Sequence, residues 1–327
     1  MKNGFYMGYD ASALNAQELL AQAENLLNLG FYSAGYDVLR LGDAGRFENA
    51  EALGAKLRSV GFKLDITIPC AASAEEAEAL VKLWQPAMVT LTGAADHEKT
   101  EKLMESLNGV RIAVCVDEKD LAWAAEKADV AELDVLTETG DYFDVTRHQL
   151  DSCREGDVDT EKSDANLRAK AMKDGGVWYP GTLPCRFDYY RNEAIFLNIC
   201  VLGCPLVLCG DVEKLPAAYA ALVKNEKLIR MASLGVGHVA RYYDPWHSLL
   251  AKAETEKTGF ALILNRCHGD QPTNILPADL GWDCRFRLMS WPEGDLLGAN
   301  LETFEAHVET SDHPQTPCCR LYRLEQL

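Results

Sequence analysis

The sequence predicts an α/β protein, a (β/α)8 TIM barrel followed by a small antiparallel β-sandwich. From residue 4 to about 235, short apolar runs with β character alternate with amphipathic runs of helical spacing. Eight such units in this length are typical of a closed barrel, in which strands that alternate with helices form a parallel sheet. The alternation stops near residue 237. We therefore expect a barrel domain over 1–235 and a β-sandwich over 236–327.

The expected elements of the barrel follow one another in strict order. Strands are expected at 4–10, 36–42, 62–69, 87–93, 110–117, 130–136, 175–180 and 205–211. The helices that follow them are expected at 16–30, 47–61, 73–85, 97–109, 118–128, 142–153, 189–203 and 214–235. Several of these helices end in glycine, which favours a left-handed C-cap. An open doubly wound sheet is the main alternative, but no glycine-rich phosphate loop follows the first strand.

The last part of the chain contains short extended runs separated by Gly, Pro, Asn and Asp. These runs lie at 237–244, 247–254, 259–266, 284–291, 302–309 and 318–324, and none reads as a helix. Short strands between turn residues are typical of antiparallel sheet. The acidic segment 151–164 is expected to be a solvated loop.

Composition excludes several classes of function. The net charge of −18 argues against binding to nucleic acid or to an anionic membrane, since both need basic patches. No apolar run approaches the roughly 20 residues of a membrane span, and the N-terminal segment lacks the apolar core of a signal peptide. We therefore expect a cytoplasmic protein. The sequence leaves the oligomeric state open, a homo-oligomer included.

The eleven cysteines are expected to be buried free thiols. Their number is odd and they are scattered through apolar runs. Two close pairs, Cys200 with Cys204 and Cys318 with Cys319, lack the spacing and the histidine partners of a zinc site. Neither a metal site nor a cofactor is expected.

Candidate functional residues lie where the expected strands end, because active sites of barrels are found at the carboxyl ends of the strands. Carboxylates and aromatic residues dominate there, and one stretch, 132–144, has five carboxylates in thirteen residues. Paired carboxylates near aromatic rings suit sugar chemistry. Acidic residues also cap the helices that follow strands, and Asp211 is expected to be such a cap.

Three segments resemble the α-galactosidase (melibiase) clan of retaining glycosidases. The longest, "MGYDASALNAQELLAQAENLLNLGFYSAGYDVLRLGD" (7–43), is similar to the opening of those proteins. The segments "LGAKLRSVGFKLDITIP" (53–69) and "PLVLCGDVEKLPAAYAALVKNEKLIRM" (205–231) resemble later parts of the same clan. The resemblance spans residues 5 to about 232 and implies a barrel with a sugar-binding cleft.

The resemblance also implies where the catalytic groups belong, and the chain departs from several of them. The stretch "VTLTGA" puts Thr90 at the position of the clan's lysine and Thr92 at that of its nucleophilic aspartate. The stretch "TETGD" puts Asp141 at the position of the acid/base. Of the aspartate pair on strand 2, only Asp43 remains, and strand 7 keeps Trp178.

We therefore expect a glycoside hydrolase-like protein that binds a small sugar. Hydrolysis is expected to be weak or absent, because threonine is a weak nucleophile without an adjacent base. The expected catalytic residues are Asp141 and Asp117; the expected substrate-binding residues are Tyr9, Asp10, Asp43, Thr90, Thr92, Trp178 and Tyr179. One alternative is an active glycosidase with Asp141 as acid/base and a relocated second carboxylate, either Asp117 or Asp43. Another is a different barrel chemistry around a divalent ion held by aspartates 10, 43 and 117.

Overall fold

A computed structural model of the 327-residue chain describes residues 5–116, 120–133, 176–177, 182–183, 189–203, 205–235, 237–244, 247–265, 269–270, 272–310 and 319–327. The chain divides into two compact units. The first unit comprises Met1–Tyr142, Ala171–Cys185 and Pro205–Leu215, and the second comprises Phe143–Lys170, Arg186–Cys204 and Pro216–Leu327. The domains 1–235 and 236–327 stay a prediction.

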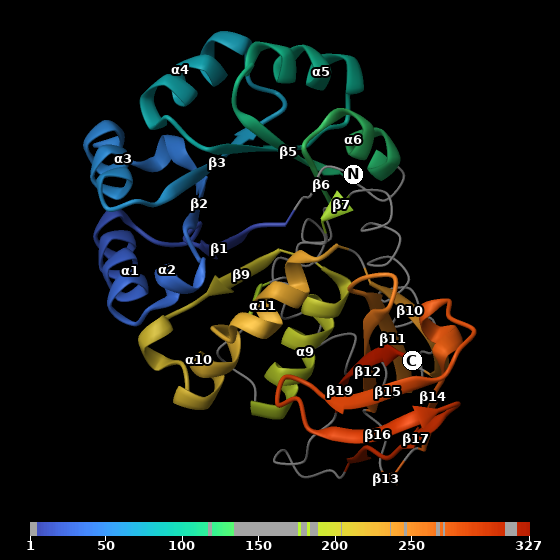
Figure 1. The fold of residues 1–327 in the computed structure, drawn as a ribbon. Helices are drawn as coiled ribbons and strands as arrows, with labels where there is room; N and C mark the ends of the chain where they lie inside the picture. The colour runs from blue at the N-terminus through green and yellow to red at the C-terminus, as the bar shows by residue number, and fades with distance from the viewer. Residues whose placement is uncertain are drawn as a thin grey trace. The chain divides into compact units, whose positions relative to one another are not determined.

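The first unit is built on a parallel sheet, so the predicted α/β class is confirmed. Its strands are β1 (Met7–Asp10), β2 (Val38–Asp43), β3 (Lys63–Pro69), β4 (Met88–Thr92), β5 (Arg111–Val116), β6 (Val130–Leu133), β7 (Gly176–Val177), β8 (Thr182–Leu183) and β9 (Leu206–Cys209). They are ordered β7-β6-β5-β4-β3-β2-β1-β9-β8, and neighbours run parallel. The sheet is curled, with helices along its outer side (Figure 1).

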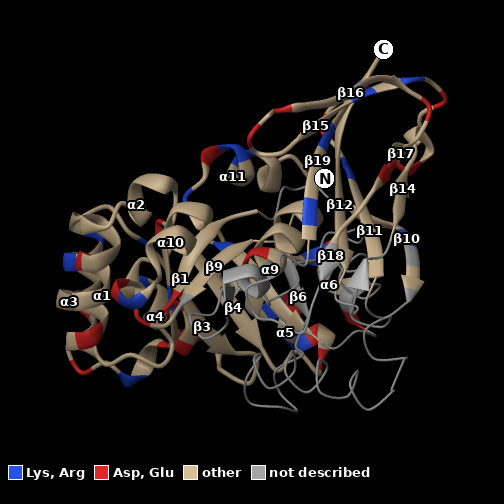
Figure 2. Cartoon of the chain, turned by 90° about the horizontal axis from the view of Figure 1, so that it is seen from below, with Lys and Arg blue, Asp and Glu red and all other residues tan. Residues whose placement is uncertain are grey.

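The helices of this unit begin where the sequence supplies caps. They are α1 (Ala16–Asn28), α2 (Phe31–Ala34), α3 (Ala50–Ser59), α4 (Ala74–Trp84), α5 (His97–Ser106) and α6 (Leu121–Lys127), with 3-10 turns η1 (Ala44–Arg46) and η4 (Val212–Lys214). Asn15 with Glu18 and Ser73 with Glu76 form capping boxes at α1 and α4, which satisfy backbone donors of the first turn. Charged residues gather along helices such as α1, α3, α4 and α5 (Figure 2).

The two faces of the parallel sheet differ in composition. Alternate residues such as Leu39, Ile66 and Leu91 are fully buried on the face that the helices cover. The opposite face, here called the inner face, carries a smaller apolar cluster that consists of Tyr6, Val38, Met88, Ala113, Val130 and Val207. Since side chains alternate between faces along a strand, this cluster identifies which residues near the strand ends point inward.

The second unit contains the helices α9 (Tyr189–Leu202), α10 (Ala217–Val223) and α11 (Glu226–Ser233). The prediction of one continuous helix over 214–235 is therefore wrong, because two separate helices lie in this range. Pro216 stands at the N-cap of α10, and the Asn225 side chain accepts the backbone N–H groups of Lys227 and Leu228 to begin α11. A proline and an asparagine cap within one apolar run restart the helix twice.

The rest of the second unit is antiparallel, as predicted. A six-stranded sheet has the order β10-β11-β12-β19-β15-β16, and two short ladders pair β13 with β18 and β14 with β17. The bounds are β10 (His238–Asp244), β11 (His247–Ala253), β12 (Thr258–Asn265), β13 (Gly269–Asp270), β14 (Thr273–Ile275), β15 (Phe286–Ser290), β16 (Leu296–Leu301), β17 (Phe304–Ala306), β18 (Glu309–Thr310) and β19 (Cys319–Gln326), with a 3-10 turn η5 (Pro277–Leu280). One core joins the large sheet to Ile275 and Ala306 of a ladder.

A fully buried lysine joins this sheet to two helices. Lys252, on β11, donates from Nζ to the carbonyl oxygens of Cys200 and Ala232, each at 3.1 Å. Both carbonyls lie in the last turns of α9 and α11, where backbone acceptors need partners from outside the helix, and the Cys200 carbonyl also accepts the Gly203 N–H at 3.3 Å. The amine also lies at the negative ends of two helix dipoles. Across the described residues, no helix combines the length and the apolar character needed to cross a membrane.

Candidate active site

The candidate site lies at the carboxyl ends of the parallel strands, which meet at one edge of the sheet. Five predicted site residues are described there: Tyr9, Asp10, Asp43, Thr90 and Thr92. The other four, Asp117, Asp141, Trp178 and Tyr179, lie outside the described residues. The predicted helix at 142–153 and the loop at 151–164 lie outside them as well.

Strand register places Asp10, Thr90 and Thr92 on the inner face. Asp10 is the Cα partner of Arg40, Arg40 is the partner of Asp65, and Asp65 is the partner of Met88 on β4. Thr90 and Thr92 follow Met88 at intervals of two and so share its face. Asp10 and Thr92 are half-buried, and each ends its strand. The structure thus brings these two residues to one face and one edge.

Asp43 reaches the same face through an irregularity in β2. The register with β3 shifts between Arg40 and Asp43, so that Asp43 becomes the partner of Thr67. Gly42 lies in this shift with φ +64°, and a Cβ added there would lie 2.8 Å from Ser12 Cβ. Asp43 is exposed, and its Oδ1 accepts the backbone N–H of Gly45 at 2.9 Å. This carboxylate therefore caps η1 and retains a second oxygen for other partners.

Tyr9 is placed differently from its neighbour Asp10. Its side chain is 1% exposed, and its hydroxyl donates to the carbonyl oxygen of Gly210 at 2.7 Å. Because successive strand residues face opposite sides, Tyr9 points away from the inner face while Asp10 points into it. In this structure, Tyr9 presents its ring to the helix-covered side of the sheet.

Thr90 belongs to a buried polar network that sequence reasoning missed. Its Oγ1 donates to Asp65, with both carboxylate oxygens within 3.1 Å, and accepts from Arg40 Nη2 at 3.4 Å. Arg40 Nε lies 3.1 Å from Asp65 Oδ2, and its Nη1 donates to the Tyr6 hydroxyl at 2.8 Å. All of these side chains are buried. The network fills the inner face below the ends of β2, β3 and β4.

Cys115 on β5 also lies near the carboxyl end of its strand, where the sequence reasoning looks for candidate residues. Its register partner is Glu132 on β6, and it lies two residues after Ala113 of the inner-face cluster. Cys115 is half-buried, in contrast to Cys70, which follows β3 and is buried. Burial raises the pKa of the Cys70 thiol, an effect that exceeds the opposing influence of a hydrogen bond with Thr100 and of the Lys99 charge. Cys115 is therefore the more accessible of these two thiols.

Two further features bear on the chemistry available here. The Asp211 side chain accepts the Glu213 backbone N–H and so caps η4, as predicted. A hydrogen bond from Lys214, with further ones from Gln22 and the Glu213 backbone, lowers the pKa of this carboxyl group. Within the described ranges, no three His, Cys, Asp or Glu side chains are grouped so that they could hold a metal ion.

No protein-family model and no curated protein sequence matches the chain. Among solved structures, α-galactosidase I from Mortierella vinacea superposes with a TM-score of 0.77 at 12% identity, over 99% of this chain and 97% of its own. The chain has the fold of the α-galactosidases.

Two other structures with this fold agree over similar lengths. The α-galactosidase from Saccharomyces cerevisiae, solved with raffinose, gives a TM-score of 0.74 at 12% identity, over 100% of this chain and 98% of its own. A candidate alpha-galactosidase/melibiase from Bacteroides fragilis gives 0.78 at 15% identity, over 99% of this chain and 80% of its own. The resemblance found in the sequence is thus confirmed at the level of the α-galactosidase fold.

Proposed function

We propose that this chain is a glycoside hydrolase-like protein that binds a small sugar at the carboxyl ends of its strands and hydrolyses it weakly or not at all. The observation that carries the proposal is the α-galactosidase fold over nearly the whole chain, including 98% of an enzyme solved with raffinose. The half-buried Asp10 and Thr92 and the exposed Asp43 would contact sugar hydroxyls. We place the protein in the cytoplasm.

We propose further that the sheet closes into an eight-stranded barrel over 1–235, followed by a β-sandwich over 236–327. Support comes from the two ends of the sheet, β7 and β8, which are separated only by residues 178–181. β7 runs parallel to β6, and β8 runs parallel to β9 at the other end of the order. β7 and β8 would together complete the ring, because β7 pairs with β6 and β8 pairs with β9 at the two ends of the remaining strands.

The weak hydrolysis in this proposal follows from the residue at the end of β4. Thr92 would occupy the position of the nucleophile, and its side chain makes no hydrogen bond to a described residue that would activate it. Asp141 remains the proposed acid/base, and Asp117 the second proposed catalytic residue. Thr90 is proposed to support the site from below, since its hydroxyl is already engaged by Asp65.

Thiol labelling tests sugar binding at this site. We expect iodoacetamide to modify Cys115 and Cys284, which are half-buried, and to leave Cys70 unmodified, because burial both raises the pKa of that thiol and blocks access. Raffinose at saturating concentration should slow labelling of Cys115 and leave Cys284 unchanged, as read by peptide mass spectrometry. If raffinose leaves the Cys115 rate unchanged, or slows both thiols equally, sugar binding at the strand ends is refuted.

A further inference from the structure

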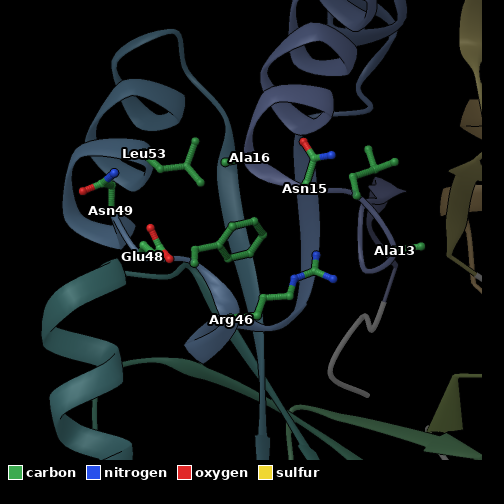
Figure 3. A pocket seen from close by; sticks show the side chains of 9 residues that line it. Ala13, Asn15, Ala16, Arg46, Glu48, Asn49 and Leu53 are labelled. Atoms are coloured by element: carbon green, nitrogen blue, oxygen red, sulfur yellow. The ribbon is translucent and has the colours of Figure 1, made fainter.

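A cavity outside the inner face has the volume of a small-molecule site. It has a volume of about 490 Å³ and lies between the connection after β1 and the one after β2. Volumes of about 300–1,000 Å³ are typical of small-molecule sites. Figure 3 shows Ala13 and Asn15 on one side of it and Glu48, Asn49 and Leu53 on the other. None of the inner-face residues lines it.

The base of the cavity is apolar and held in place. Phe47 and Leu53 line it and are buried, while Leu14 is half-buried. The Phe47 ring packs edge-on against the fully buried Trp84, with ring centroids 5.5 Å apart. A ring fixed from behind offers an apolar surface that costs little conformational entropy when a ligand packs against it.

Next to Phe47, the wall of the cavity is formed by Arg46, whose side chain is fixed by hydrogen bonds. Arg46 donates to the carbonyl oxygens of Ser12, Ala11 and Leu41, and so ties the two connections together. Its guanidinium also lies 4.6 Å from the centre of the Phe47 ring. These contacts use three of the five N–H donors and fix the direction of the remaining two.

The rim carries side chains with free hydrogen-bonding groups. Within the described part of the chain, Asn49 makes no capping bond and Glu48 has no partner. Asn15 uses its carbonyl oxygen for the N–H groups of Gln17 and Glu18, and its amide nitrogen has no hydrogen-bond partner among the described residues. The charges of Arg46 and Glu48 balance, so the cavity has no net charge to select an anion.

We propose that this cavity is a second carbohydrate site, which takes one pyranose-sized uncharged sugar ring. A sugar ring has an apolar face, which would pack on Phe47 and Leu53, and hydroxyl groups that both donate and accept hydrogen bonds. The two amides, the carboxylate and the guanidinium supply both kinds of partner around the rim. The proposal uses the same class of ligand as the proposed function but depends on different residues.

The test is an NMR titration of the full chain, labelled with ¹⁵N-asparagine and ¹⁵N-threonine, with methyl α-D-galactopyranoside and raffinose. We expect saturable shifts of the side-chain amides of Asn15 and Asn49, with a Kd in about the millimolar range. Ala13→Trp should fill the cavity and abolish these shifts. The matched control Ala55→Trp, at an exposed position of α3 outside the lining, should keep them.

Two further measurements make the proposal falsifiable and separate it from the proposed function. Asn49→Ala should weaken binding about fivefold, as expected for one hydrogen bond, without lowering Tm, because Asn49 caps nothing. Shifts of the Thr92 amide report the strand-end site and should persist in Ala13→Trp. Shifts at Thr92 alone would overturn the second site and leave the proposed function standing. Shifts of the asparagines with inorganic phosphate but not with either sugar would also overturn it.

Discussion

Arg40→Met is expected to lower the free energy of unfolding by about 3–5 kcal/mol, because it leaves the buried Asp65 carboxylate without its cation. The side chains of Arg40 and Asp65 are only 7% and 2% exposed. The substitution also removes the donor to the Tyr6 hydroxyl. Urea denaturation of the variant beside the wild type measures the loss.

The double variant Arg40→Met with Asp65→Leu removes both charges. It therefore shows whether the single change costs stability because it leaves one buried charge unpaired. Replacing both charges by apolar groups should cost much less than the sum of the single changes. A matched control lies on β3, the strand of Asp65: Lys63 pairs with Asp37 at 2.6 Å, but its side chain is 57% exposed. Lys63→Met should therefore cost less than about 1 kcal/mol. Equal losses for Arg40→Met and Lys63→Met would contradict a buried network.

Lys252→Met is expected to destabilise the protein by about 2–4 kcal/mol, since the carbonyls of Cys200 and Ala232 each lose the hydrogen bond from this amine. Methionine keeps most of the unbranched apolar stem of lysine. The loss of stability therefore comes from removal of the amine and not from a cavity. The backbone packs tightly around this amine, which leaves little room for another donor to replace it. A Cβ on Gly203 would lie 3.2 Å from Lys252 Nζ and 2.0 Å from Gly235 O.

Hydrogen exchange locates this effect. The last turns of α9 and α11 should exchange faster in Lys252→Met, while β15 and β16 at the other end of the sheet keep their protection. Lys257→Met, on the exposed turn before β12, is the matched control and should change neither stability nor exchange. An unchanged Tm for Lys252→Met would refute the role of this lysine.

Much of the fold follows from local patterns in the sequence. Apolar runs that alternate with amphipathic ones predict β1–β6, β9 and the helices between them, because burial on both faces of a parallel sheet dictates those patterns. The broken helix over 214–235 was missed because its apolar spacing is continuous, although Pro216 and Asn225 supply the breaks. The antiparallel character of the second unit follows from the density of turn residues.

The site is less accessible to sequence reasoning, because register decides which residues meet. Arg40 and Asp65 stand out as charges within apolar strands, but only the pairing of β2 with β3 shows that they face each other. Asp43 reaches the inner face through a register shift that no periodicity reveals. By contrast, the alternation of side chains along β1 is enough to place Tyr9 and Asp10 on opposite faces of the sheet. The predicted roles of Asp117, Asp141, Trp178 and Tyr179 stay predictions.

The central claim is a sugar-binding protein without the nucleophile of a retaining glycosidase. The most direct measurement is the turnover of an aryl α-galactoside by the purified protein, with trapping of any covalent glycosyl-enzyme. Enzymes take about 8–23 kcal/mol off such barriers, and loss of the nucleophile at residue 92 should remove most of that. We predict turnover at or near the uncatalysed rate, no trapped intermediate, and loss of any residual turnover in Asp141→Asn. Robust turnover with retention through a covalent intermediate would contradict the account.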